Sequence, residues 1–203
     1  MKKIGFYFLI LLIPVLITGC SGIKDTMENA QRLKFKLGKV DGLNIAGVRL
    51  NNISSLNDLN ILDGGKLIAA FASGQLPTKF TVNLIAKNPD TYPGGTKETS
   101  SLIKSLDWRL LIDNKEIITG EIDKTIEVPG VGKSTTIPIP VTIDLFRIFA
   151  DKSYENILNL ALAIGGKSGS SSRLTLKIKP TIDTFLGGIS YPGEIDVIDK
   201  EFR

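Results

Sequence analysis

Apolar and polar side chains alternate along much of the chain beyond residue 40. Four stretches show this period of two most clearly: residues 80–87, 106–113, 136–145 and 174–179. Strict alternation indicates β-strands that have one face in a core and the other in water. Several such strands with turn residues between them favour an antiparallel sandwich over a parallel α/β sheet. We therefore expect a mainly β protein built as an antiparallel β-sandwich.

Two local signals refine this strand pattern. Asp113-Asn114-Lys115 lies between two apolar runs and is typical of a hairpin turn, because Asn tolerates positive φ. Pro138 and Pro140 stand two residues apart in one strand. Their missing N–H groups belong to the same lateral side, so that side cannot form a full ladder. We therefore expect this strand at a sheet edge, where prolines also hinder pairing with other chains.

Two segments depart from the alternation and predict helices. Residues 63–73 are expected to form a short capped helix that ends at a glycine. A second helix is expected to begin after Asp151 or Ser153, to carry an apolar stripe, and to stop at residues 165–166, which are both Gly. No internal repeat or linker divides the remainder. Residues 39–203 are therefore expected to form a single β-sandwich domain with one or two short helices.

The first twenty residues indicate where the protein is held. Two lysines precede an apolar run, residues 4–17, which at about 14 residues is shorter than a membrane-spanning helix needs. The run leads into Ile17-Thr18-Gly19-Cys20. This resembles a bacterial lipoprotein signal with its lipobox, in which residues 1–19 are the signal peptide and Cys20 becomes the acylated first residue. The alternatives are an ordinary signal peptide with a chance cysteine, or an uncleaved anchor.

The resemblance to lipoproteins implies a membrane partner and a compartment. Two or three acyl chains on Cys20 would anchor the chain firmly, since each buried methylene contributes about 0.8 kcal/mol. Ser21 stands where an inner-membrane retention signal often has Asp, so we expect a lipid-anchored envelope protein at the outer membrane, facing the periplasm. Residues 20–38 are expected to form a tether. Alternatively, a spacer runs into a first strand, because apolar residues alternate from 33 to 37.

The amino-acid composition excludes several kinds of catalytic and metal-binding site. The chain of 203 residues has no His and one Cys, which excludes Ser-His-Asp and Cys-His nucleophile systems, His-ligated metals and an internal disulfide. The net charge of +4 falls to about +2 when the leader with its two lysines is removed, since 23 basic residues then face 21 acidic ones. That balance gives no argument for nucleic acid as a partner. We expect no cofactor.

The stretch from residue 80 to about 147 carries a set of motifs in a recognisable order. A strand runs into Asn-Pro-Asp, an aromatic-led hairpin ends in Gly, and a Val-Pro-Gly-Val-Gly-Lys turn leads into a Pro-containing strand. This order resembles the water stress and hypersensitive response domain of the group 2 late embryogenesis abundant proteins. The matching positions are Asn88, Pro89, Asp90, Trp108, Gly120, Pro129, Gly132 and Pro138.

That resemblance covers about a third of the chain and implies both a fold and a context. The implied fold is an immunoglobulin- or fibronectin type III-like β-sandwich, in agreement with the alternation. The implied context is desiccation and other stress, with no catalytic residue set to carry over. The chain departs from the family pattern at Asp90, where Asn is usual, at Trp108, where Tyr is commoner, and in a Gly/Thr/Ser-rich insertion at residues 94–101.

Some other short patterns resemble ligand-binding motifs, but their residues do not meet the requirements of those motifs. Gly132-Lys133-Ser134 resembles the end of a phosphate-binding loop, yet Glu127 stands where that motif needs Gly. A calcium loop needs an oxygen ligand at residue 62, which is Leu, so a turn that caps the first helix better explains the neighbouring acids. Two further acidic sets are expected to be ordinary charged surface rather than a metal site: Glu116, Glu121, Asp123 and Glu127, and Glu194, Asp196, Asp199 and Glu201.

Three functions are compatible with these features. The favoured one is a non-catalytic binding or protective module, anchored in the membrane through acylated Cys20 and contacting an envelope protein or peptide. The second is a carrier or sensor of a small apolar ligand in the periplasm, which an apolar cavity beyond about 300 Å³ would favour over a filled core. The third is an enzyme with paired carboxylates, as in glycoside hydrolysis, which requires two acids converging in a cleft.

Overall fold

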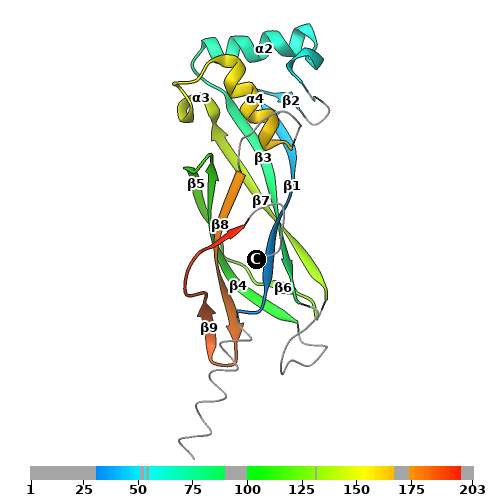
Figure 1. Cartoon of the computed structure of the whole chain (residues 1–203), viewed down its shortest axis with the longest axis vertical. Coiled ribbons are helices and arrows are strands. Elements are labelled where there is room, and N and C mark those ends of the chain that lie inside the picture. The colour runs from blue at the N-terminus through cyan, green and yellow to red at the C-terminus, as the bar shows by residue number, and fades with distance from the viewer. Residues whose placement is uncertain are drawn as a thin grey trace, which may run out of the picture.

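The structure is a computed structural model that describes residues 31–50, 53, 55–89, 100–130, 132–166 and 174–197. Two antiparallel sheets stack into an elongated sandwich, and short helices cover one end of it (Figure 1). The predicted antiparallel β-sandwich with short helices is confirmed. Cys20, the expected signal peptide and Asp90 lie outside the described residues.

The first sheet has four strands in the order β2-β1-β3-β7. These are β1 (Lys34–Ile45), β2 (Val48–Arg49), β3 (Pro77–Lys87) and β7 (Ser134–Asp144). The ladder between β3 and β7 runs without a bulge from Pro77 opposite Asp144 to Lys87 opposite Ser134. Since β7 has a neighbour on one side only in the described sheet, the strand with Pro138 lies at an edge, as predicted.

The second sheet follows the order β10-β8-β4-β5, with β6 also paired to β4 and β9 to β8. Its strands are β4 (Ser101–Ile112), β5 (Lys115–Ile122), β6 (Ile126–Val128), β8 (Leu174–Thr184), β9 (Gly187–Ser190) and β10 (Ile195–Val197). Between β4 and β5, Asp113 and Asn114 have φ of 50° and 64°. Two successive positive φ values are typical of a type I′ turn, so the hairpin predicted here is confirmed.

The described residues also include four helical segments: η1 (Leu56–Asp58), α2 (Ile61–Ala72), α3 (Leu145–Ile148) and α4 (Tyr154–Ile164). Helix α4 begins after its cap Ser153, as predicted, and its chain turns at Gly166 with φ of 74°. Helix α2 begins at Ile61, two residues before the expected start, because Asn60 and not Asp63 is its N-cap. Within the described residues, no helix combines the length and apolar character needed to cross a membrane.

The boundary between tether and domain lies earlier than expected. Leu33, Phe35 and Leu37 are buried, with exposed fractions of 2%, 0% and 5%. They form the inward face at the start of β1, while Lys34 and Lys36 point away from the core. The last residues of the expected tether 20–38 therefore belong to the sandwich, which agrees with the alternative of a spacer that runs into a first strand.

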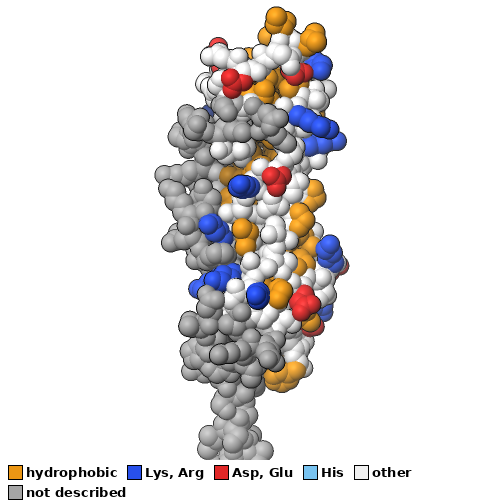
Figure 2. Space-filling view, turned by 90° about the vertical axis from the view of Figure 1, so that its right-hand side faces the viewer, with side chains coloured by type: hydrophobic (Ala, Val, Ile, Leu, Met, Phe, Trp, Pro, Cys, Tyr) orange, Lys and Arg blue, Asp and Glu red, His pale blue; other side chains and the backbone are white. Residues whose placement is uncertain are grey.

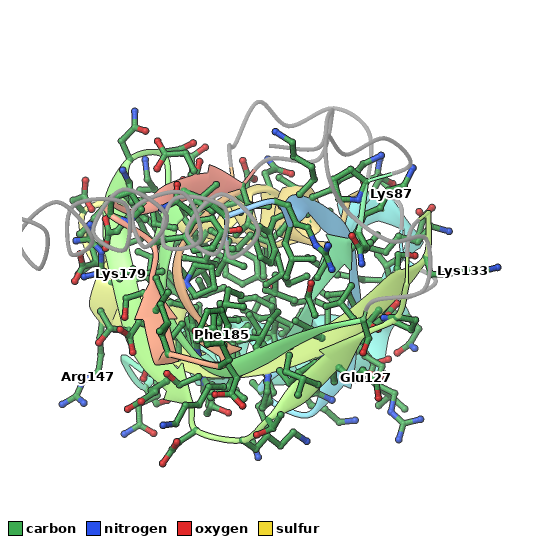
Figure 3. All side chains as sticks on the ribbon, turned by 90° about the horizontal axis from the view of Figure 1, so that it is seen from below. Lys87, Glu127, Lys133, Arg147, Lys179 and Phe185 are labelled. Carbon is green, nitrogen blue, oxygen red and sulfur yellow. The ribbon has the colours of Figure 1, made fainter. Side chains whose placement is uncertain are left out.

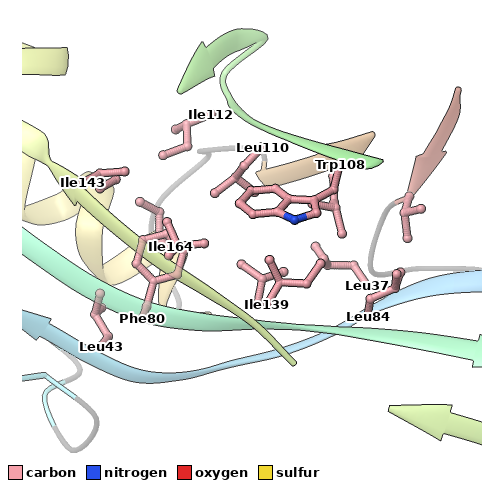
Figure 4. Close-up of a cluster of buried hydrophobic side chains, with 14 of the residues drawn as sticks. Leu37, Leu43, Phe80, Leu84, Trp108, Leu110, Ile112, Ile139, Ile143 and Ile164 are labelled. Atoms are coloured by element: carbon pink, nitrogen blue, oxygen red, sulfur yellow. The ribbon is translucent and has the colours of Figure 1, made fainter. Parts of the chain in front are cut away.

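One continuous core joins the two sheets and α4. It is formed by the inward-facing residues of the long strands, and the apolar face of α4 closes it at one end. Figure 4 shows Ile164 of α4 beside Phe80 and Ile143, and Trp108 farther along the same core. Because none of these core residues is more than 8% exposed, the space between the sheets is filled.

Candidate functional site

An apolar groove of about 400 Å³ opens where the margins of the two sheets face each other. One wall is the edge strand β7, and the other is formed by the end of β5, the β5–β6 connection and the start of β6. The lining residues are Trp108, Glu121, Ile122, Lys124, Ile126, Thr136, Ile137, Pro138, Ile139 and Pro140. The groove thus joins three segments of the chain: β4 at Trp108, residues 121–126 and residues 136–140.

Trp108 forms the floor of this groove because its cross-strand neighbour has no side chain. Trp108 on β4 lies opposite Gly120 on β5. A Cβ atom built on Gly120 would lie only 2.7 Å from Cε2 of the indole, closer than real Cβ atoms approach. The ring therefore covers the space that a side chain at Gly120 would fill. Trp108 is 8% exposed, and Figure 4 shows its indole beside Leu110 and facing Ile139.

The β7 wall offers hydrogen-bond acceptors more readily than donors. Pro138 and Pro140 stand opposite Asn83 and Thr81 in the unbroken ladder with β3. Because proline has no N–H, these two residues must face away from β3, toward the open margin. Their carbonyl groups face the same way, since N and C=O of one residue share a side in an antiparallel strand. An incoming strand could therefore form only part of a ladder here.

The rim of the groove carries one charge of each sign. Glu121 and Lys124 are exposed and line the wall opposite β7. The deeper lining consists of Ile137 and Ile139, which are 3% and 0% exposed. A groove with an apolar floor, carbonyl acceptors along one wall and solvated charges at its rim suits an apolar group that carries a polar end.

A second hollow, of about 700 Å³, lies beside the turn between β1 and β2. Its lining includes Arg49, Lys79 and the backbone of Gly42 and Gly47, and none of its residues is buried. It is therefore a depression between exposed side chains. The groove over Trp108 is the better candidate because its floor reaches the core.

Three of the other motif residues converge at the opposite end of β7 from the helices. Asn88 follows β3, and its side-chain amide donates a hydrogen bond to the carbonyl oxygen of Pro129 over 3.1 Å. Its backbone carbonyl accepts from the N–H of Gly132 over 2.9 Å, and its N–H donates to the carbonyl of Lys133 over 2.9 Å. Gly132 has φ of 81°, which favours glycine. These contacts tie the exit of β3 to the turn before β7, where Pro89 is half-buried.

The structure thus divides the motif residues into two groups. Trp108, Gly120 and Pro138 lie at the groove, whereas Asn88, Pro129 and Gly132 hold the turn. Sequence reasoning missed the groove itself and most of its wall, including Ile122, Lys124 and Ile126, because it forms between strands of different sheets. The available signal was the acceptor-rich edge at Pro138 and Pro140.

Three residues of the two acidic sets, Glu116, Glu194 and Asp196, take part in surface ion pairs. Arg109 bonds Glu194 and also Glu116, the latter over 2.7 Å, and these two bonds raise the pKa of its guanidinium above the ordinary value. Asp196 pairs with Lys177 over 2.9 Å. Asp199 and Glu201 lie outside the described residues. No group of three or more potential metal ligands gathers in the part of the chain that the structure describes.

The acids near α2 act on the helix start. Asn60 accepts a hydrogen bond from the N–H of Asp63 over 2.8 Å, and its amide donates to the Asp63 carboxylate over 2.8 Å. Asn60 is thus the N-cap of α2, and the bond between the two side chains holds it in place. Hydrogen bonds from Asn60 and Lys66 lower the pKa of Asp63 below its ordinary value. Asp58 accepts from the N–H of Ser55 over 2.8 Å, so a capped turn accounts for this set.

Comparison with known proteins gives distant structural neighbours only. No protein-family model matches the chain, and no curated protein matches it. A solution structure described as that of a candidate late embryogenesis abundant protein is 16% identical and covers 92% of this chain and 84% of its own, with a TM-score of 0.38.

Two further solved structures are equally remote. A protein from Arabidopsis thaliana is 18% identical over 83% of each chain, with a TM-score of 0.34. A protein from Archaeoglobus fulgidus is 12% identical and covers 59% of this chain and 82% of its own, with a TM-score of 0.32. At these scores the likeness assigns no family, and the fold stands on the chain's own sheets and registers.

Proposed function

We propose that this chain is a non-catalytic, lipid-anchored binding module of the cell envelope. The observation that carries the proposal is the apolar groove between β7 and the β5–β6 margin, with Trp108 as its floor. Acylated Cys20 holds the module at the outer membrane, facing the periplasm. The anchor rests on the lipobox-like sequence that ends at Cys20.

The bound partner is an apolar segment of an envelope protein or peptide. The half-buried Ile122 and Ile126, together with the exposed rings of Pro138 and Pro140, provide apolar surface that such a segment would cover. The carbonyls of Pro138 and Pro140 accept hydrogen bonds from its polar groups. A complete added strand is excluded by the missing N–H groups, so side chains and isolated donors of the partner occupy the groove.

The physiological setting is protection of envelope components during desiccation or related stress. This part of the proposal rests on the sequence resemblance of residues 80–147 to the water stress and hypersensitive response domain. The residues that carry that resemblance include Trp108, Gly120 and Pro138 at the groove. A strain without the protein should then lose viability on drying, and the wild-type gene, but not a gene with a blocked groove, should restore it.

Photocrosslinking in intact cells tests the groove. A benzophenone amino acid replaces Lys124 at the rim, and a matched control replaces Glu155, which is equally exposed on α4. The proposal expects a discrete protein or peptide adduct at position 124 that is absent at position 155. Identical adduct patterns at both positions, or none at position 124, would show that the groove does not hold the partner.

A second candidate function is favoured by the volume of the groove. The groove has a volume of about 400 Å³, which is above the roughly 300 Å³ at which pockets for small ligands begin. The space between the sheets, in contrast, is filled by side chains. Organic extraction of the purified protein followed by mass spectrometry separates the two functions. A stoichiometric small apolar molecule that is lost in Ile122→Asp supports the carrier, whereas a partner adduct without such a molecule supports the binding module.

Metabolic labelling tests the anchor independently of the groove. Cells that express Cys20→Ala should incorporate no labelled palmitate into this protein, whereas Ser21→Ala should incorporate as much as the wild type. The neighbouring serine is the matched control because it leaves the cysteine in place. Equal labelling of Cys20→Ala and wild type would refute acylation at this residue.

A further inference from the structure

Two large apolar side chains project into solvent at the turn between β8 and β9. Phe185 is 81% exposed and Leu186 is 53% exposed. The turn is well bonded, because the Thr184 hydroxyl donates to the carbonyl of Gly187 over 2.7 Å and accepts from the N–H of Leu186 over 3.2 Å. The exposed pair therefore stands on a defined hairpin.

This turn lies at the end of the sandwich where the chain enters from its amino-terminal segment. Arg32 donates to the hydroxyl of Ser101 at the start of β4 over 2.9 Å. The start of β4 also pairs with the end of β8, since Ile103 stands opposite Ile182. Figure 1 shows the β8–β9 hairpin at the end opposite α2, and Figure 3 shows Phe185 in the view onto that end.

We propose that the β8–β9 turn dips into the bilayer that holds the protein, with Phe185 and Leu186 among the lipid headgroups and upper acyl chains. This inference rests on the proposed anchor at Cys20. Twelve Cα–Cα steps separate Cys20 from Arg32, so the tethered end stays within about 40 Å of the membrane surface even on a fully extended chain. The length of this segment therefore allows the turn at that end to reach lipid, where exposed apolar side chains gain by partitioning.

The charges of this end favour an anionic surface. Exposed lysines at this end of the sandwich come from three segments: Lys34 at the start of β1, Lys104 near the start of β4 and Lys133 before β7. Lys104 is the nearest, since its Cδ lies 3.5 Å from where a Cβ of Gly188 would be. Among the described residues of this end, Asp183 and Glu127 carry the opposite charge. The basic excess attracts anionic headgroups within a Debye length.

The opposite end supplies an internal comparison. Ile61 and Leu62 at the start of α2 are 94% and 78% exposed, and hydrophobic side chains project at that end in Figure 2. They are as apolar as the β8–β9 turn, but the body of the sandwich separates them from the entry of the chain (Figure 1). A membrane contact that depends on the tether would involve Leu186 and leave Leu62 in water.

Depth-dependent quenching tests the inference on the full-length lipoprotein purified from membranes. Leu186→Cys and Leu62→Cys each add one free thiol, since Cys20 is the only native cysteine and the proposed lipid on its sulfur blocks that thiol. The thiol is labelled with an environment-sensitive fluorophore, and the protein is placed in vesicles of phosphatidylethanolamine and phosphatidylglycerol that carry nitroxide on their acyl chains. We expect at least twofold quenching and a blue shift at position 186, and neither at position 62.

The controls separate this inference from the anchor on which it rests. If the wild-type chain takes up the label or fails to float with the vesicles, Cys20 is not acylated and both proposals fall. In the second outcome the protein floats, the wild type stays unlabelled, and position 186 is quenched no more than position 62. The anchor is then supported, and the proposed membrane contact of the turn is wrong. Phe185→Cys repeats the measurement on the neighbouring side chain and must give the same result as Leu186→Cys.

Discussion

The indole of Trp108 occupies the space that a side chain on Gly120, its partner across β4 and β5, would need. The two residues are 12 apart in the chain and are brought together by the type I′ turn at Asp113 and Asn114. Because the ring lies over the glycine, it forms the floor of the groove. The shape of the candidate site thus depends on the absence of one side chain.

Gly120→Ala should lower the free energy of unfolding by about 1–3 kcal/mol, because the added Cβ overlaps the indole and forces the ring or the strand to move. Urea denaturation followed by circular dichroism measures the change. Gly193→Ala is the matched control, since a Cβ there meets nothing within 4 Å and the φ is not in the left-handed region. Equal stability of Gly120→Ala and Gly193→Ala would contradict the packing described for Trp108.

Replacing both Pro138 and Pro140 by Thr should promote self-association. The two changes restore N–H groups on the open side of β7, which can then pair with the same edge of another molecule. Size-exclusion chromatography with light scattering, at protein concentrations of tens of micromolar, should detect dimers or larger species. The control, Thr136→Ser with Thr142→Ser, leaves the number of edge N–H groups unchanged and should stay at the wild-type mass. A monomeric Pro-to-Thr variant would count against the protective role of the prolines.

Tyr191 should make the protein less stable at high pH. Burial raises the pKa of its phenol above the ordinary value of 10.0, and its ring packs edge-on against Phe35 at 6.3 Å between centroids. The folded protein therefore keeps the proton at pH values where the unfolded chain has released it. Stability contributed by this group is complete below about pH 10 and is lost as the pH rises, by up to about 1.4 kcal/mol per pH unit.

Urea denaturation between pH 8 and pH 11 tests whether Tyr191 lowers the stability of the protein as the pH rises. The difference in unfolding free energy between wild type and Tyr191→Phe should be constant up to about pH 9.5 and should then shift in favour of the variant. Taking the difference removes the contribution of lysines, which both proteins share. A difference that stays constant to pH 11 would show that the phenol ionises at its ordinary pKa in the folded state.

The sequence predicts those parts of the fold that depend on local rules. Alternation predicts the long strands because side chains on successive residues face opposite sides of a sheet. The edge position of β7 follows from the donors that Pro138 and Pro140 lack. The start of α2 was placed two residues late because both Asn60 and Asp63 can cap a helix, and only the hydrogen bonds show that Asn60 occupies the cap.

Other features depend on contacts between distant segments and could not be read from local patterns. The start of β1 resembles a tether because Lys34 and Lys36 give it the charge of a solvated spacer, although the apolar residues that alternate with them, Leu33, Phe35 and Leu37, are buried. The groove forms only when Trp108, the β5–β6 margin and β7 are placed by the stacking of the two sheets. The sequence likewise contains Phe185 and Leu186 but does not reveal that their turn lies beside the chain entry.

A nuclear magnetic resonance titration shows whether the groove over Trp108 binds an apolar group. The chain has a single Trp, so its ¹H–¹⁵N spectrum contains one indole N–H signal. Decanoate below its micellar concentration serves as the probe, because its alkyl chain mimics an apolar side chain or a lipid. We predict a saturable shift of the Trp108 indole signal together with Ile126 and Ile139, while Ile61 and Leu62 on α2 do not move. Shifts that fail to saturate, or that affect α2 as much as the groove, would contradict the account.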